Sequence, residues 1–326
     1  MKDKIVISKT PLRVSFVGGG TDMPYFYNKY SGGTVSCAID RYIYVTVKYH
    51  DNHQEKYRLN YSTTEITSSL NKIKNLRIKS AIRMLKIKKP LYINTFADIP
   101  SNSGLGSSSA FTVGLIAALS ELDNQKLSKI KIAEMAFKIE TKVTHNSVGK
   151  QDHYIATYGG INYIKYQKNK VLVSPLNINT KEIKIFFDKM FLVWTGKNRS
   201  ASDVLNDQKN NIKKNIYYLK KMNKHTSDFK KEILKKKLNS NKLFKIINLT
   251  WEIKKKLSTL ITNKHIEKLF TKLINDGAQI GKLLGAGNGG FILINVNSKL
   301  KKKLESNPVK KNYINFKIEE KGVTIL

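Results

Sequence analysis

The segment 100–110, PSNSGLGSSSA, combines residue types that can bind a phosphate group. Gly104 and Gly106 carry no Cβ atom, so the backbone at these positions can approach an anion closely. Three serines follow at the start of an apolar periodic run, where the unpaired N–H groups of a helix attract anions. Their hydroxyls can cap the helix or coordinate Mg²⁺. The segment predicts a phosphate-binding loop, and in isolation an ordinary serine-capped helix explains it equally well.

Two further glycine clusters stand at the ends of predicted strands. Gly18–Gly20 follow a strand that presents Arg13, and residues 285–290, GAGNGG, precede another strand. Only 19 of the 326 residues are glycine, so these clusters exceed what chance turns would produce. The absence of a G-x-x-x-x-G-K-[ST] motif excludes an ordinary P-loop, and the G-x-G patterns lack the βαβ context of a dinucleotide fold.

Hydrophobic periodicity predicts the elements that position these segments. Runs of β-branched and aromatic residues predict strands at 5–7, 12–17, 35–49, 91–96 and 161–166, and apolar residues at helical spacing predict helices at 23–30, 107–122, 129–142 and 149–157. The predicted phosphate-binding loop therefore lies between a strand and a helix.

The composition changes after Met190. Residues 201–276 are lysine-rich and predicted to be helical, and strand patterns return at 282–296 and 313–326. The polar segment 177–182 is the best boundary, which predicts two α+β domains, 1–180 and 181–326, with a cleft between them.

The formal charge of +35 is spread over short lysine clusters, and arginine is scarce. This distribution favours a solvated surface over a nucleic-acid site, and its field favours anionic ligands. A single cysteine, Cys37, fits a reducing compartment. The sequence shows no signal-peptide pattern and no stretch of 18 apolar residues. We expect a cytoplasmic protein without a membrane or nucleic-acid partner.

The glycine-rich segments resemble, in order, the three signature motifs of the GHMP kinase superfamily. They lie at 11–22, 100–110 and 282–291, so the resemblance spans nearly the whole chain. It implies a ribosomal protein S5 domain 2-like N-terminal domain, a ferredoxin-like C-terminal domain, and ATP and Mg²⁺ as cofactors. Asn288 stands where glycine is more usual, and because Asn tolerates positive φ we expect the third motif to keep its shape.

Within the superfamily, the chain is most similar to the D-glycero-D-manno-heptose 7-phosphate kinases. The segments that carry this similarity are GGGTD at 18–22, IDRY at 39–42, GKQD at 149–152, YGGINY at 158–163, TG at 195–196 and RSAS at 199–202. His153 stands where that branch more often has Gln. The resemblance implies phosphorylation of the anomeric C1 hydroxyl of heptose 7-phosphate, giving the 1,7-bisphosphate for nucleotide-activated heptose and surface polysaccharide.

The resemblance also assigns roles to single residues. Asp152 matches the catalytic carboxylate that accepts the proton of the sugar hydroxyl, and Arg13 matches the cation that keeps it ionised. Ser108 and Glu140 match the Mg²⁺ ligands. The implied nucleotide ligands are Pro100, Ser103, Gly104, Leu105, Gly106, Ser107, Ser108, Ser109 and Gly287, and the implied sugar ligands are Gly19, Gly20, Thr21 and Asp22. Taken singly, Asp152 or Asp22 can be a helix cap, and Glu140 or Arg13 a surface residue.

A phosphorylated sugar needs a second anion site, for which Lys150, Lys197 and Arg199 are candidates. The nearest rival function is a GHMP kinase of unphosphorylated fucose or galactose. A decarboxylase on the same fold is a further alternative, and a basic, non-catalytic nucleic-acid-binding protein is a distant one. We expect a monomer or a homodimer.

Overall fold

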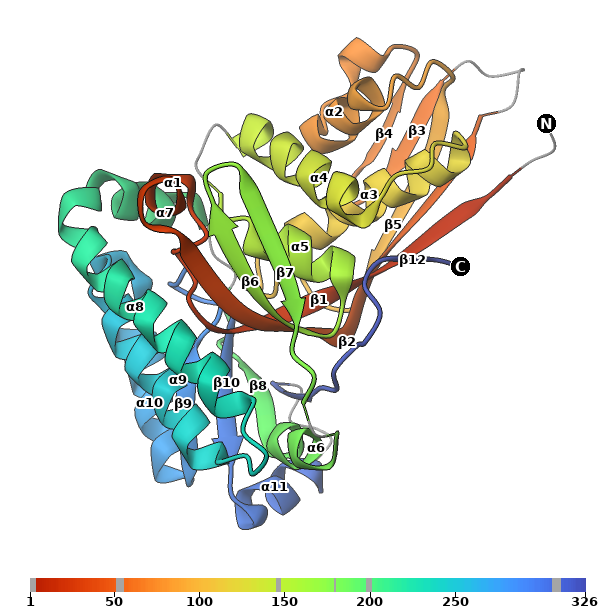
Figure 1. The fold of residues 1–326 in the computed structure, drawn as a ribbon. Coiled ribbons are helices and arrows are strands. Elements are labelled where there is room, and N and C mark those ends of the chain that lie inside the picture. Colours follow the sequence, from red (N-terminus) through yellow and green to blue (C-terminus); the bar gives the residue numbers. More distant parts are fainter. Residues whose placement is uncertain (1–3, 51–55, 145–147, 179, 198–200, 307–311) are drawn as a thin grey trace.

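The structure, a computed structural model, describes residues 4–50, 56–144, 148–178, 180–197, 201–306 and 312–326. Within these residues the strands form two sheets (Figure 1). The first sheet contains β1 (Val6–Val17), β2 (Gly32–Tyr49), β3 (Tyr57–Asn60), β4 (Thr64–Thr67), β5 (Leu91–Ala97), β6 (Ile161–Gln167), β7 (Lys170–Pro175) and β12 (Thr324–Ile325). The second contains β8 (Met190–Trp194), β9 (Ala278–Leu283), β10 (Phe291–Val296) and β11 (Tyr313–Asn315).

The long strand β2 organises the first sheet. It pairs antiparallel with β1, β5 and β6, and its β-branched and aromatic residues suit a pleated, half-buried surface. The two strands predicted at 5–7 and 12–17 are one strand, β1, with a register shift between Pro11 and Leu12. Proline has no N–H group to donate to the ladder, which explains the irregularity at this point.

The helices of the N-terminal half are α1 (Pro24–Tyr30), α2 (Leu76–Met84), α3 (Ser107–Leu122), α4 (Lys129–Thr144) and α5 (Gln151–Tyr158). Helix α3 has the predicted bounds and packs against β1 and β2, with most of its side chains buried. In Figure 1, α3, α4 and α5 lie together on one side of the sheet. Of these helices, α3 and α5 contact β1, the strand that carries Arg13.

The C-terminal half contains α6 (Thr180–Asp188), α7 (Ala201–Asn210), α8 (Ile212–Ile233), α9 (Ser240–Lys255), α10 (Lys264–Asn275) and α11 (Ser298–Glu305). The predicted helical region 201–276 thus consists of four helices and a 3₁₀ turn, Thr259–Ile261. The second sheet is antiparallel in the order β11-β8-β10-β9, and α9 and α10 both contact β9. Figure 1 shows α8, α9 and α10 together on one side of this sheet.

The end of the chain returns to the first sheet. Strand β12 pairs with the start of β1, and Ile318 bridges to Ile39. The division into 1–180 and 181–326 stays a proposal, with these last residues lying in the sheet of the N-terminal half.

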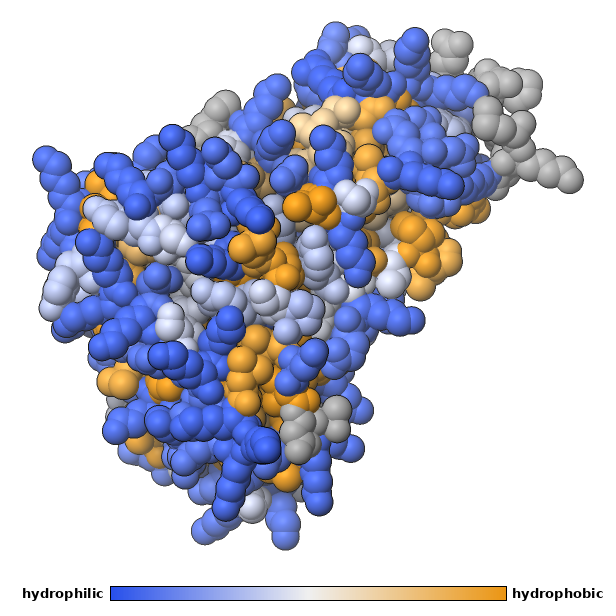
Figure 2. Space-filling view, in the orientation of Figure 1, coloured by the Kyte–Doolittle hydropathy of each residue, from blue (hydrophilic) through white to orange (hydrophobic). Residues whose placement is uncertain are grey.

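The surface is largely hydrophilic on the face drawn in Figure 2, where apolar residues form separate patches. Among the described residues, no helix combines the length and the hydrophobicity that crossing a membrane requires.

Candidate active site

A cavity of about 310 Å³ collects residues from both halves of the chain. The N-terminal half supplies the residues we call the loop wall: Arg77, Gly106, Ser107, Ser108 and Glu140. The C-terminal half supplies the lysine wall: Gln208, Lys254, Leu257, Lys282 and Gly285. Arg13, Asp22 and Asp152 complete the charged groups around it. The glycine clusters at 18–20, 104–106 and 285–290 therefore meet at one site.

Arg13 and Asp152 form a bidentate ion pair at this cavity. Arg13 Nε donates to Asp152 Oδ1 at 2.7 Å, and Nη2 donates to Oδ2 at 2.6 Å. Nη1 donates to the carbonyl of Gly104 at 2.6 Å, which connects the pair to the predicted phosphate-binding loop. Arg13 is buried, whereas the Asp152 side chain keeps 24% of its surface exposed. The arginine fork fixes the orientation of a carboxylate that still faces the cavity.

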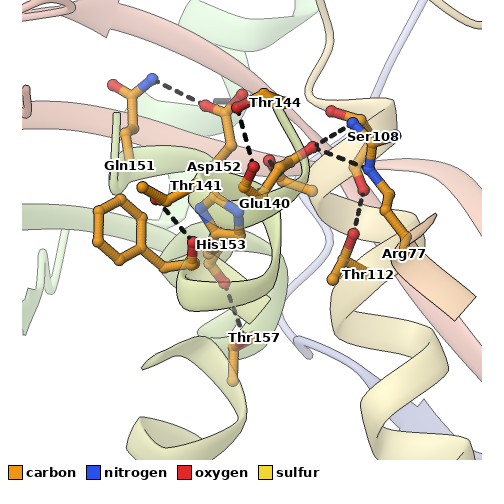
Figure 3. Close-up of polar contacts among 12 residues, drawn as sticks. Arg77, Ser108, Thr112, Glu140, Thr141, Thr144, Gln151, Asp152, His153 and Thr157 are labelled. Carbon is orange, nitrogen blue, oxygen red and sulfur yellow. Dashed lines mark hydrogen bonds and ion pairs between the residues drawn. The ribbon is translucent and has the colours of Figure 1, made fainter. Parts of the chain in front are cut away.

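Glu140 is a buried carboxylate with partners on both oxygens (Figure 3). Arg77 Nη2 donates to Oε1 at 3.0 Å, while His153 Nε2 and the Ser109 hydroxyl each lie 2.7 Å from Oε2. Burial alone would raise the pKa of Glu140, but His153, Arg77 and Ser108 outweigh it and hold the pKa well below its usual range. Glu140 therefore carries a stable negative charge inside the protein.

Asp22 holds two backbone segments together at the cavity. Its Oδ1 accepts from the Gly20 amide at 2.9 Å, and Oδ2 accepts from the Gln151 amide at 3.1 Å at the start of α5. A Cβ on Gly149 would lie 2.0 Å from Oδ2, so only glycine fits there. Burial raises the pKa of Asp22. Asp22 thus accepts a hydrogen bond at the start of α5 and lines the cavity, and its role as a sugar ligand stays a prediction.

The predicted phosphate-binding loop adopts the conformation its glycines suggest. Gly106 begins α3 with φ of 79°, in the left-handed region that glycine tolerates best. The third motif packs directly on this loop, because the Phe291 amide donates to the Ser103 carbonyl at 3.0 Å. Asn288 has φ of 63°, in the left-handed region that asparagine tolerates better than most other residues with a Cβ atom.

A second cavity, of about 750 Å³, adjoins the first. It is lined by Tyr61, Phe96, Pro100 and Phe111 among others. The residues that line both cavities are Arg77, Asn102, Ser107 and Ser108. The start of α3 therefore forms the junction between a wider cavity with apolar and aromatic walls and a narrower charged one.

The structure brings most of the sequence-predicted site residues to these cavities. Those that line one or both are Arg13, Gly19, Gly20, Asp22, Pro100, Gly104, Gly106, Ser107, Ser108, Ser109, Glu140 and Asp152. Ser103, Leu105 and Thr21 are buried behind the site, where Leu105 and Thr21 support the backbone by hydrogen bonds.

Other predicted ligands lie elsewhere. Gly287 packs against the backbone of Ile261, and Lys197 is exposed; neither residue is among those that line the two cavities described above. Lys150 also stays outside the cavity lining, with its ammonium over the rings of Tyr27 and Phe137. Burial lowers the pKa of Lys150. Arg199 lies outside the described residues.

Two buried lysines of the lysine wall were missed as site residues. Lys254 Nζ donates to the carbonyls of Gly285 and Leu283, and Lys282 Nζ lies 3.4 Å from the Phe16 carbonyl. Burial and the nearby Arg13 lower the pKa of Lys282 to about 7. Lys282 starts the third motif, a signal that was available, whereas Lys254 is one of three consecutive lysines and cannot be singled out from sequence.

Comparison with known proteins identifies relatives along the whole chain. The family description "GHMP kinases N terminal domain" matches residues 72–160. The chain is 32% identical to a D-glycero-alpha-D-manno-heptose 7-phosphate kinase of Campylobacter jejuni, over 89% of this chain and 88% of that protein. Two solved structures are similar in fold: a D-glycero-D-manno-heptose 1-phosphate kinase from Bacteroides thetaiotaomicron (TM-score 0.79, 25% identity, 98% of each chain) and a putative sugar kinase from Campylobacter jejuni (TM-score 0.73, 27% identity, 100% of this chain and 99% of that one).

Proposed function

The chain belongs to the GHMP kinase family and is an ATP-dependent sugar kinase, and we propose that its acceptor is D-glycero-D-manno-heptose 7-phosphate. The proposed reaction transfers the γ-phosphoryl group of ATP to the anomeric C1 hydroxyl and gives the 1,7-bisphosphate. The observation that carries the proposal is the lysine wall: two buried lysine side chains share one cavity with the exposed edge of Asp152. Buried cations beside a carboxylate suit a sugar that is itself an anion.

Asp152 is the proposed general base. The sugar hydroxyl oxygen attacks the γ-phosphorus, the bond to the β,γ-bridging oxygen breaks, ADP leaves, and the hydroxyl proton passes to Asp152. Arg13 holds both oxygens of this carboxylate and so fixes its direction. Gln151 adds a donor to Oδ1 at 3.2 Å, and it is held in turn by the Ser15 hydroxyl. These contacts orient the base before the substrate arrives.

The two cavities together suit a nucleotide. The aromatic lining of the wider cavity suits a purine base, and the junction at Ser107 and Ser108 suits the phosphates. The N-terminus of α3 lies at this junction, and its first backbone N–H groups have no partner within the helix. The helix dipole attracts negative charge to this end. Since the loop has no Walker lysine, these amides and nearby cations must offset the triphosphate charge.

Ser108 and Glu140 fit the implied Mg²⁺. Both line the same cavity and offer hard oxygen ligands, and the described residues contain no group of three or more His, Cys, Asp or Glu side chains that could hold a metal alone. This set is typical of Mg²⁺, which takes one or two protein oxygens and completes its shell with phosphates and water. When bound, the ion would neutralise charge that develops on the phosphates.

The proposed distal anion site is Lys254 with Lys282. The Nζ atoms of both lysines contact backbone carbonyls, and these contacts restrict the motion of the two side chains at the cavity. A sugar whose C1 hydroxyl lies at Asp152 would extend its phosphate toward this wall. The two lysines take the place of the sequence candidates Lys150 and Lys197, which lie outside the cavity lining.

A substrate panel tests the proposal. We expect ADP release in a coupled assay to be fastest with D-glycero-D-manno-heptose 7-phosphate and slow with fucose, galactose and unphosphorylated heptose. The rival acceptor, an unphosphorylated hexose, predicts the opposite order. Turnover of free hexoses above that of the heptose phosphate would refute the proposed substrate and leave the kinase assignment intact.

A further inference from the structure

Arg77 occupies a position that none of the three signature motifs predicts. It lies in the first turn of α2, which Asn75 caps, and its side chain keeps 27% of its surface exposed. Nε and Nη2 lie 3.3 and 3.0 Å from Glu140 Oε1, which makes an ion pair with a nearly fully buried carboxylate. These contacts use two of the five N–H donors of a guanidinium. Three N–H donors of Arg77 therefore remain with which it can engage a second anion.

The place where that second anion would sit follows from the cavities. Arg77 lines both of them, together with Asn102, Ser107 and Ser108 at the start of α3. A nucleoside triphosphate with its base in the wider cavity and its terminal phosphate beside Asp152 must pass this junction. Arg77 is the cation among the residues that line both cavities. Guanidinium forks pair with phosphate oxygens in the same bidentate geometry as with carboxylates.

The contacts of Glu140 add a second constraint. A carboxylate offers about four lone-pair sites. In the structure, Arg77 contacts Oε1 through two nitrogens, and His153 and Ser109 contact Oε2. Any cation that binds Glu140 must therefore displace a partner. His153 and Ser109 are buried, whereas Arg77 is partly exposed at the cavity, so Arg77 is the partner that can leave.

We propose that Arg77 exchanges anions: it neutralises Glu140 until a nucleoside triphosphate spans the junction, then binds the triphosphate and releases Oε1 to a divalent cation. The inference rests on the proposed nucleotide site. It assigns Arg77 the phosphate-binding task that a lysine performs in an ordinary P-loop. It also makes metal binding at Glu140 depend on nucleotide, because the guanidinium repels a metal ion for as long as it stays.

Binding measurements on Arg77→Gln test both halves of the exchange. We expect ATP, titrated calorimetrically in EDTA, to bind about 10- to 100-fold more weakly to this variant, whereas adenosine binds as to the wild type. Mn²⁺ alone, followed by electron paramagnetic resonance, should bind about three- to tenfold more tightly, because the positive charge of Arg77 no longer repels the ion from Glu140. A purely structural arginine would lower both affinities together.

Two further variants serve as controls. Arg83→Gln removes an exposed arginine of the same helix that contacts Asn71, and it should change neither affinity. Arg77→Lys keeps the positive charge but lacks the planar guanidinium, so it should retain part of the ATP affinity. This variant carries the test if Arg77→Gln folds poorly. Unchanged ATP affinity, or weaker Mn²⁺ binding, in Arg77→Gln would overturn the exchange. A wild-type chain that binds no ATP would instead overturn the proposed nucleotide site.

Discussion

The two walls of the charged cavity hold their cations in different ways. On the loop wall, Arg77 pairs with the carboxylate of Glu140, and at its edge Arg13 pairs with Asp152. On the lysine wall, Lys254 and Lys282 contact backbone carbonyls, which carry only partial charge. The cations of the loop side are therefore oriented by carboxylates, whereas the two lysines of the lysine wall are oriented by backbone carbonyls.

This difference separates two tasks. Ion pairs fix the direction of groups that must meet a reacting atom within a few tenths of an ångström. A lysine ammonium group at a cavity attracts an anion as a point charge and tolerates variation in where that anion lies. We therefore expect changes at the Arg13–Asp152 pair to alter kcat and changes on the lysine wall to alter KM for the phosphorylated sugar.

The largest expected effect comes from Asp152→Asn. The amide cannot accept the hydroxyl proton, so kcat should fall about 10²- to 10⁴-fold in a coupled ADP-release assay. ATP affinity, measured by calorimetry, should stay within about threefold, because Asp152 is not proposed to bind the nucleotide. A variant with near-normal kcat would remove Asp152 from the role of base and with it the distinction between the walls.

Lys254→Met tests the lysine wall at nearly constant side-chain volume. Loss of one charge-assisted contact should raise KM for heptose 7-phosphate about 10- to 100-fold, with kcat and KM for ATP much less affected. The matched control is Lys256→Met, an exposed lysine two residues further on, which should leave all three values unchanged. Equal increases of KM for sugar and ATP would show that Lys254 acts through the fold.

The burial of Lys282 gives a pH-dependent stability. Its pKa lies near 7 in the folded protein against 10.5 for a free lysine, so between these values the unfolded chain binds more protons. Stability attributable to Lys282 should therefore rise with pH across this window, by up to about 1.4 kcal/mol per pH unit.

Urea denaturation of the wild type and Lys282→Met over this pH range isolates the effect. The free energy of unfolding of the wild type should increase relative to that of the variant as the pH rises above about 7. A constant difference would mean that Lys282 titrates alike in both states, and that the lysine wall is less desolvated than its burial indicates.

The smallest effect is expected for His153→Gln. Glutamine can donate one hydrogen bond to Glu140 Oε2 as the imidazole does, so kcat should change by less than about threefold. His153→Ala should lower activity more, because it leaves a buried carboxylate oxygen with one donor fewer. If Gln and Ala behave alike, the histidine does not position Glu140.

Local sequence chemistry was sufficient to predict the loop at 100–106 and the helix α3 that follows it. Glycine at 104 and 106 and a run of serines at a helix start have local backbone preferences that do not depend on the rest of the fold. Helix α3 begins and ends where its sequence pattern predicts. GHMP membership, the sugar-kinase activity and the two-domain fold class inferred from these motifs are confirmed by the relatives. The individual roles of Asp152, Arg13 and Ser108 stay predictions.

Only the tertiary structure decided which lysines enter the cavity. The sequence pattern of a polar helix face is the same whether one of its lysines is solvated or buried, because the long side chain can extend in either direction. The fold places Lys254 against the Gly285 carbonyl and leaves Lys197 exposed, although the sequence favoured the second. The same holds for Arg77, whose contact with Glu140 joins residues 63 positions apart. Motifs record short-range backbone needs, whereas burial of a charge depends on what the rest of the chain packs around it.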